Sequence, residues 1–484
     1  MHADGTFDVR CSRRAFVWRG AMTGLSGAAL PTLLAACGNA SPTPTNPPTS
    51  APAATTAPPA RSTAAPATAP AASITTGANS TNSPILFVHG NSDSSALWIT
   101  TLWRFESNGY PRERLFAIDY PNPTARDDDA IPQPGRSGTE EQRTQLAAKV
   151  DAVLAQTGAS KLALVGNSRG ANSIRNYVKH GGAEKVSHVV LGGGVNHGVY
   201  SAPGNNSEFN GASRFMQELN AGSEVVLGVA FMTIRSDKFD KYAQPMLGTG
   251  APSNISYDAP ELKGATNVIL EGIDHRETAF SARAFAEMFR FITGHTASAD
   301  STPESSVRLS GLITGYENKV PTNLPVAGIA VTIFAVDPAT GARIGAPVHQ
   351  MMTSADGSWG TFTGSPTANY EFVIQQPGAA IRHIFRSPFP RSSSVVSMRL
   401  AEDAPIANQG VVIFTRPRGY VATGRDKHLL DGVPVPGVKE GIPTDSAFKV
   451  PFSGPERAVP ASLNGEKMTV RTIPGDVVYA EFHY

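Results

Sequence analysis

A predicted strand, turn and helix follow one another in the stretch K-L-A-L-V-G-N-S-R-G-A-N-S-I-R-N-Y, Lys161 to Tyr177. Its apolar run at 162–165 predicts a buried strand, and the pattern at 171–178 predicts a helix. Between them lies G-N-S-R-G, whose two glycines let strand and helix approach closely and present Ser168 at the tip of the turn. We predict that Ser168 is a nucleophile. The alternative is a structural serine in a chance motif, since the chain contains 46 glycines.

Strand and helix patterns alternate on both sides of this motif. Short apolar runs predict strands at 85–88, 115–118, 162–165, 189–191, 229–234 and 268–270. Amphipathic spacing predicts helices at 98–105, 146–154, 171–178 and 285–292, with glycines after several of them as stop signals. This alternation predicts an α/β fold with a doubly wound, mostly parallel sheet over residues 84–297.

A serine hydroxyl becomes a good nucleophile only when a base takes its proton and an acid orients that base. After a strand–turn–helix elbow of this kind, the partners follow in the order Ser, Asp or Glu, then His. His275 follows the last predicted strand and precedes the last helix, so we predict that it is the base. Asp240 and Asp237 both follow the strand that ends at Ile234, and either could be the acid.

Two backbone N–H groups should bind the oxyanion of a tetrahedral intermediate. We predict that one belongs to Arg169, directly after the nucleophile, and the other to Asn91, in the loop after the first strand. His89, in the same loop, is interpreted as a buried, hydrogen-bonded turn residue.

Other polar residues near these candidates receive structural interpretations. His197 precedes both candidate acids in the chain, so we expect it to line the site or to be structural. Asp274 is expected to be a local surface carboxylate. Residues 120–140 show neither helical nor strand period and predict a solvated loop, with a flap over the site as the alternative.

With these motifs in place, the chain resembles the α/β-hydrolase lipases, and most closely archaeal long-chain lipases with a C-terminal β-barrel domain. The likeness rests on F-V-H-G, R-F-E-S-N-G-Y-P-R-E-R, K-L-A-L-V-G-N-S-R-G, A-F-A-E-M-F-R-F-I-T-G and F-R-S-P-F-P-R. It implies that Ser168 is the nucleophile and His275 the base. In those archaeal lipases the acid ends the strand after the elbow helix, where this chain has Gly193. The T-x-x-S…D-x-x-V-x-P pattern of other lipases favours Asp240.

The C-terminal third changes to a period of two. Residues 305–400 alternate apolar and polar side chains between turns such as D-P-A-T-G, which predicts an antiparallel β domain. Its layout resembles the immunoglobulin-like modules related to carboxypeptidase regulatory domains. The pattern of residues 401–484 predicts further short strands. The C-terminal third could therefore form either two small β units or one composite barrel. These domains could be passive spacers or could help to bind an acyl chain.

The N-terminus carries two targeting patterns. S-R-R-A-F resembles a twin-arginine export signal, and L-A-A-C, which ends at Cys37, resembles the lipobox of bacterial lipoproteins. We therefore expect a signal over 1–36, acylation of Cys37 and a Pro/Thr/Ala-rich linker over 37–83. The protein would be exported and lipid-anchored to the bacterial cell envelope, in the periplasm or at the surface. An ordinary signal peptide with a chance cysteine is the alternative.

Composition narrows the possible partners. The 41 Lys and Arg residues balance 40 Asp and Glu residues, and no basic block is present, so nucleic acid is not an expected partner. No C-x-x-C or H-E-x-x-H pattern supports a metal site, and we expect no cofactor. Both cysteines precede residue 38, so no disulfide is expected in the folded part. The oligomeric state is left open.

These observations predict a serine carboxylic ester hydrolase that cleaves lipid or fatty-acyl esters through an acyl-enzyme intermediate. The first alternative is an extracellular depolymerase of polyesters such as polyhydroxyalkanoates. The second is a non-catalytic surface-binding protein built on a hydrolase fold.

Overall fold

The computed structural model describes residues 82–400 and 409–484. The predicted signal segment, Cys37 and nearly all of the linker lie outside these residues. Within the described part of the chain, no helix combines the length and the apolar character needed to cross a membrane.

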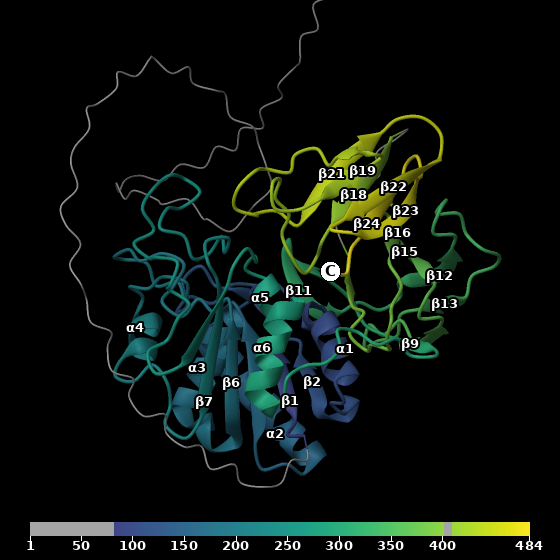
Figure 1. Cartoon of the computed structure of the whole chain (residues 1–484). Helices are drawn as coiled ribbons and strands as arrows, with labels where there is room; N and C mark the ends of the chain where they lie inside the picture. The colour runs from purple at the N-terminus through teal and green to yellow at the C-terminus, as the bar shows by residue number, and fades with distance from the viewer. Residues whose placement is uncertain (1–81, 401–408) are drawn as a thin grey trace, which may run out of the picture. The chain divides into compact units, whose positions relative to one another are not determined.

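A parallel six-stranded sheet forms the centre of residues 84–297, which we call the α/β part (Figure 1). Its strand order is β2-β1-β5-β6-β7-β8, and every neighbouring pair is parallel. The strands are β1 (Ile85–Val88), β2 (Leu115–Ile118), β5 (Leu162–Asn167), β6 (Val186–Gly192), β7 (Ala230–Ser236) and β8 (Thr266–Leu270). This sheet confirms the predicted α/β fold.

Helices cover both faces of this sheet. They are α1 (Ile99–Ser107), α2 (Thr139–Thr157), α3 (Arg169–Tyr177), α4 (Arg214–Asn220), α5 (Glu277–Phe280) and α6 (Ala282–Thr293). On one face, Phe105 of α1 packs against Phe87 of β1 and against Phe285 of α6. On the other face, α2 and α3 bury Val150 and Ile174 in one core with the sheet. Because both faces are covered, β1 and β5 can be apolar along almost their whole length.

The close approach of α3 to the end of β1 depends on Gly170. A Cβ atom at this position would lie 2.5 Å from the carbonyl oxygen of Val88 and 2.7 Å from that of His89. Real Cβ atoms do not come so near to a backbone oxygen, so any side chain at residue 170 would push α3 away from the end of β1. The glycine thus keeps the turn that contains Ser168 tight against the neighbouring strand.

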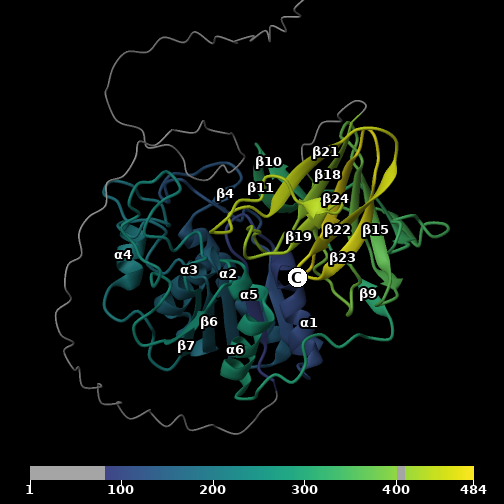
Figure 2. The same cartoon turned by 45° about the horizontal axis from the view of Figure 1, so that its top comes forward.

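The described residues from 305 onward, which we call the β part, are built on a seven-stranded sheet of order β13-β12-β15-β16-β24-β18-β21 (Figure 2). Its strands are β12 (Ala330–Val336), β13 (His349–Met352), β15 (Asn369–Gln375), β16 (Arg382–Arg386), β18 (Gly410–Thr415), β21 (Ala447–Phe452) and β24 (Val477–Glu481). The strand β24 lies between β16 and β18 and pairs parallel with both. One sheet therefore joins both predicted β segments, which favours the composite alternative.

Smaller sheets complete the structure. In the β part they contain β9 (Val307–Leu309), β10 (Ile313–Glu317), β11 (Val320–Pro325), β14 (Phe362–Gly364), β17 (Met398–Arg399), β19 (His428–Leu430), β20 (Val433–Pro434), β22 (Arg457–Leu463) and β23 (Glu466–Thr472). In the α/β part, β3 (Thr124–Ala125) pairs parallel with β4 (Arg136–Ser137). The predicted irregular segment 120–140 thus contains one short strand pair.

Candidate active site

Ser168 lies at the turn between β5 and α3 and adopts a conformation that is unusual for a residue with a side chain. Its φ is 55° and its ψ is −122°. Non-glycine residues with positive φ are strained, and such strain is found where a side chain must be held in one direction. The Ser168 N–H donates to the carbonyl of Gly192 at 3.1 Å, which holds the turn to the end of β6. Ser168 is only half-buried, so its hydroxyl remains within reach of a substrate.

His275 and Asp240 meet through a direct hydrogen bond. The Nδ1 atom of His275 lies 2.8 Å from Oδ2 of Asp240, and both side chains are buried. The other carboxylate oxygen, Oδ1, accepts the N–H of Tyr242 at 2.8 Å. A proton on Nδ1 leaves the lone pair of Nε2 free to accept another proton. The ring of Tyr242 packs edge-on against the imidazole, with the ring centroids 4.6 Å apart.

The residue before Ser168 contacts the loop that carries His275, at the ends of β5 and β6. Asn167, directly before the serine, donates through Nδ2 to the carbonyl oxygens of Gly192 at 3.0 Å and His275 at 3.2 Å. A Cβ atom on Gly193 would lie 3.0 Å from Nδ1 of His275, so the end of β6 contacts the imidazole. Among the described residues, the buried Nε2 atom of His275 has no hydrogen-bond partner. In hydrolases with a catalytic serine, the hydrogen bond between the histidine nitrogen and the serine hydroxyl often tightens only when substrate binds.

The structure distinguishes the two candidate acids. Asp237 lies in the turn after β7, where its Oδ1 accepts the N–H of Gly272 and the hydroxyl of Ser236, both at 3.1 Å. Asp240, three residues later, is the carboxylate that bonds to His275. Gly193 lies against the same nitrogen of the ring but offers no side chain. The carboxylate therefore reaches the imidazole from the loop after β7 instead of from the end of β6.

The loop after β1, residues 89–94, which we call the oxyanion loop, lies directly against the serine. A Cβ atom on Gly90 would approach the Cβ atom of Ser168 to 2.9 Å. The side chain of Asn91 accepts the N–H of Ala125 at 2.7 Å, which orients the peptide around Asn91. Buried His89 lies at a turn, with Nδ1 2.8 Å from the carbonyl oxygen of Gly90. This arrangement agrees with its predicted structural role, and burial lowers its pKa, which keeps the ring neutral.

The β part contributes contacts to the oxyanion loop. Asn323 of β11 donates through Nδ2 to the carbonyl of Asp93 at 2.9 Å. Arg399 of β17 donates to the carbonyl of Ser92 at 2.9 Å and to Oδ1 of Asn323 at 2.7 Å. These bonds satisfy backbone carbonyls of a loop that belongs to neither a helix nor a strand.

The side chain of Arg169 ties several segments to the turn that contains Ser168. It is almost completely buried and forms an ion pair with Glu208, which is buried as well. Its guanidinium also donates to the carbonyls of Pro123 at 2.9 Å and Ser137 at 2.6 Å. The sequence suggested a role for the backbone N–H of this residue but none for its side chain. Segment 120–140 is thereby bonded to the residue that follows Ser168.

The structure agrees with the sequence interpretation of His197 but not with that of Asp274. His197 bonds to the carbonyl of Ala259 at 2.7 Å and to Glu224 at 3.3 Å, which agrees with a structural role. The interpretation of Asp274 as a surface carboxylate is wrong, because its exposed fraction is 0%. Its carboxylate is covered by residues of the β part, more than 140 positions later in the chain, and no local pattern could indicate that contact.

A hollow of about 420 Å³ opens on another part of the surface. It lies among α2, α3 and α4 and is lined mainly by polar side chains, including Glu140, Arg143 and His180. None of the candidate site residues lines it, so it is not where we place the chemistry. Among residues 82–400 and 409–484, no group of His, Cys, Asp or Glu side chains could hold a metal ion.

Comparison with protein families agrees with this geometry. Residues 82–255 match the family of class 2 lipases, and residues 305–403 match the lipase C-terminal domain. The chain is thus similar to a lipase domain over the first segment and to a lipase C-terminal domain over the second. These matches support hydrolysis of ester bonds as its class of reaction.

Solved structures show a more distant similarity. Lipase B of Aspergillus fumigatus is 16% identical over 45% of this chain and 53% of its own, with a TM-score of 0.34. Mature lipase BlEst2 of Bacillus licheniformis is 19% identical over 45% of this chain and 95% of its own, with a TM-score of 0.34. Phospholipase PlaB of Legionella pneumophila is 10% identical over 83% of this chain and 93% of its own, with a TM-score of 0.33. At these values the similarities carry no information about substrate.

The buried pair of Arg169 and Glu208 predicts a specific dependence of stability on pH. Burial raises the pKa of Glu208 from 4.5 to about 7, against the opposing effect of Arg169. Below about pH 7 the folded protein therefore keeps a proton on Glu208 that the unfolded chain has already lost, and the ion pair with Arg169 is fully formed only above that pH. The free energy of unfolding should fall by up to about 3 kcal/mol between about pH 5 and about pH 8 because of this one group. Glu208→Gln cannot ionise and should lack this part of the decrease.

Urea denaturation at both pH values, for the parent and for Glu208→Gln, measures the difference. Equal pH slopes for the two proteins would show that the carboxyl group ionises with an ordinary pKa in the folded state.

Proposed function

We propose that this chain is a serine carboxylic ester hydrolase with Ser168, His275 and Asp240 as its catalytic triad. The main support for this proposal is the buried hydrogen bond between His275 and Asp240, near the strained turn of Ser168. A carboxylate on Nδ1 holds the imidazole in the tautomer whose Nε2 can accept a proton. The match to class 2 lipases independently supports an ester as the substrate.

The proposed reaction has two halves. Nε2 of His275 takes the hydroxyl proton as Ser168 attacks the ester carbonyl, and the resulting imidazolium then protonates the departing alcohol. Asp240 stays ionised and stabilises the imidazolium. A water molecule, activated by the same nitrogen, then attacks the acyl-enzyme and releases the carboxylic acid.

The oxyanion of each tetrahedral intermediate would be bound by the N–H groups of Asn91 and Arg169. Arg169 is the first residue of α3, where the helix dipole favours a negative charge. Gly90 brings the oxyanion loop against Ser168, which supports Asn91 as the second donor. The loss of one such donor costs about 3 kcal/mol of transition-state stabilisation.

Lipid or fatty-acyl esters are the substrates that we favour, because residues 82–255 and 305–403 both match family models of lipases. The relation to archaeal long-chain lipases remains a prediction. The polyester and non-catalytic alternatives have no structural observation in their favour.

Substitution of the nucleophile tests the proposed activity. Ser168→Ala should lower kcat on p-nitrophenyl esters by at least about 10³-fold, because no other group can form the acyl-enzyme. Binding of the ester should persist, since the alanine leaves the surroundings intact. Hydrolysis by purified Ser168→Ala at the parental rate would contradict Ser168 as the nucleophile, whereas a parent without turnover would favour a non-catalytic function.

The role of Asp240 is tested against its neighbour. Asp240→Asn should lower kcat by about 10³- to 10⁴-fold, because an amide does not hold the imidazole in the productive tautomer. Asp237→Asn is the matched control, since the same change three residues away removes no contact to His275. We expect its kcat to stay within about threefold of the parental value. A larger loss in the control than in Asp240→Asn would assign the acid to Asp237.

We also propose that the protein is exported and tethered to the bacterial cell envelope through a lipid on Cys37. The twin-arginine and lipobox patterns support this location. In cells fed a labelled fatty acid, the parent should carry the label and sediment with membranes. Cys37→Ala should lose both properties, and label that persists in this variant would contradict acylation at Cys37.

A further inference from the structure

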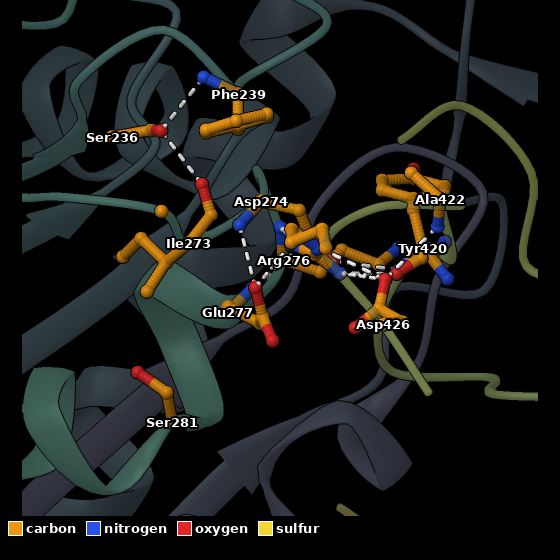
Figure 3. Close-up of polar contacts among 12 residues, drawn as sticks. Ser236, Phe239, Ile273, Asp274, Arg276, Glu277, Ser281, Tyr420, Ala422 and Asp426 are labelled. Carbon is orange, nitrogen blue, oxygen red and sulfur yellow. Dashed lines mark hydrogen bonds and ion pairs between the residues drawn. The ribbon is translucent and has the colours of Figure 1, made fainter. Parts of the chain in front are cut away.

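The loop that carries the candidate base, residues 273–277, which we call the base loop, is bonded to the β part through buried charges. Oδ2 of Asp274 accepts the N–H of Tyr420 at 2.7 Å. The same oxygen lies 3.4 Å from Arg425 and 3.6 Å from Arg416. Figure 3 shows Asp274 and Glu277 of this loop beside Tyr420 and Asp426 of the β part. The residue directly before His275 is thus held by a distant segment of the chain.

Glu277, two residues after His275, is held by the same two arginines. Its Oε1 accepts a hydrogen bond from Arg416 at 2.7 Å, and its Oε2 accepts one from Arg425 at 2.7 Å. Oε2 also accepts the N–H of Asp274 at 2.6 Å. Two guanidinium groups therefore bind carboxylates on both sides of the base.

The loop that carries the acid, residues 236–242, contacts the same region of the β part. The ammonium group of Lys241 lies 3.8 Å from the centroid of the Tyr420 ring and donates to the carbonyl of Thr444 at 2.7 Å. Burial lowers the pKa of Lys241 to about 8. Arg276 also lies over the Tyr420 ring, with its guanidinium carbon 5.3 Å from the centroid. The connection between β18 and β19, residues 416–427, thus contacts both loops whose side chains form the Asp240–His275 bond.

These charges depend on one another. Asp274 is completely buried, and the side chains of Arg416 and Arg425 are 5% and 11% exposed. A buried ion pair is costly to break, because removal of one partner leaves an unpaired charge without water. Loss of one arginine would leave the carboxylates of Asp274 and Glu277, which lie on both sides of the base, with a single guanidinium group between them. The loop would have to move to rehydrate them, and a shift of about 1 Å in a catalytic group can reduce the rate by about a hundredfold.

We propose that Arg416 and Arg425 are positioning residues for His275, so that the β part completes the active site of the α/β part. Neither arginine touches the reacting atoms; both act through Asp274 and Glu277. This inference rests on the proposed function, since it concerns the geometry of that same triad. It assigns the β18–β19 connection a role that a spacer domain would not have.

Arg425→Gln tests the inference in the full-length protein. The variant should lower kcat on p-nitrophenyl butyrate by about tenfold to a hundredfold, because the base is displaced. KM should stay within about twofold, because a group that acts only in the chemical step does not alter ground-state binding. Arg425→Lys keeps the positive charge and should recover part of the lost kcat.

Arg343→Gln provides the matched control. Arg343 forms a bidentate pair with buried Glu371, at 2.7 and 2.9 Å, entirely within the β part. Its loss should affect the stability of the β part while leaving kcat unchanged. Equal losses of kcat in Arg343→Gln and Arg425→Gln would attribute the effect to general destabilisation and overturn the inference.

A second variant covers the case in which Arg425→Gln does not fold. Asp274→Asn keeps the shape and can still accept the N–H of Tyr420 but loses the attraction to both arginines, so it should show the same selective loss of kcat. Parental kcat in the folded variant would overturn the inference while leaving the proposed function intact. A parent without turnover that depends on Ser168 would instead overturn the proposed function itself.

Discussion

The arrangement depends on one buried hydrogen bond, between the carboxylate of Asp240 and the imidazole of His275. An ionised carboxylate away from water is stable only when its oxygens are paired. Asp240 meets this requirement with the imidazole on one oxygen and the N–H of Tyr242 on the other. The same pairing fixes which nitrogen of the ring carries the proton. The stability of the carboxylate and the basicity of Nε2 therefore have a common origin.

This bond joins two loops that follow different strands, β7 and β8. The α/β sheet determines where each loop begins, but not where its far end lies. Further contacts at this edge come from the β part. Tyr420 donates its N–H to Asp274 beside the base, and Asn323 donates to the carbonyl of Asp93 in the oxyanion loop. Arg169 performs a similar function for segment 120–140. The site is thus formed by the sheet together with the residues that surround its carboxyl edge.

The sequence predicts the parts of this site that depend on local patterns. The elbow of Ser168 follows from an apolar run, two glycines and a helical stripe, all within 17 residues. Gly158 and Gly294 end α2 and α6 in the left-handed conformation, as expected for helix stops. Chain order and strand ends limited the acid to two candidates after β7, and the resemblance to a lipase pattern favoured Asp240. The hydrogen bond from Asp240 to His275 depends on the path of the loop, which no sequence pattern specifies.

The contacts that the sequence did not predict join distant segments without any repeating pattern. Glu208 lies 39 residues from Arg169, and nothing around it indicates a buried charge. Asp274 was interpreted wrongly because a lone carboxylate is usually solvated, whereas here Arg416 and Arg425 replace the water. The seven-stranded sheet also escaped prediction, since β24 enters it between β16 and β18 from the end of the chain. Periodicity defines strands, but it does not define their neighbours.

A crystal structure of the protein after reaction with a p-nitrophenyl alkylphosphonate tests whether Ser168, His275 and Asp240 form one catalytic triad. We expect phosphorus bonded to Oγ of Ser168 and the Asp240–His275 hydrogen bond retained. The phosphoryl oxygen should lie about 2.7–3.1 Å from the N–H groups of Asn91 and Arg169. Phosphorus on another residue, or an imidazole separated from Oγ by more than one bridging water, would contradict this triad.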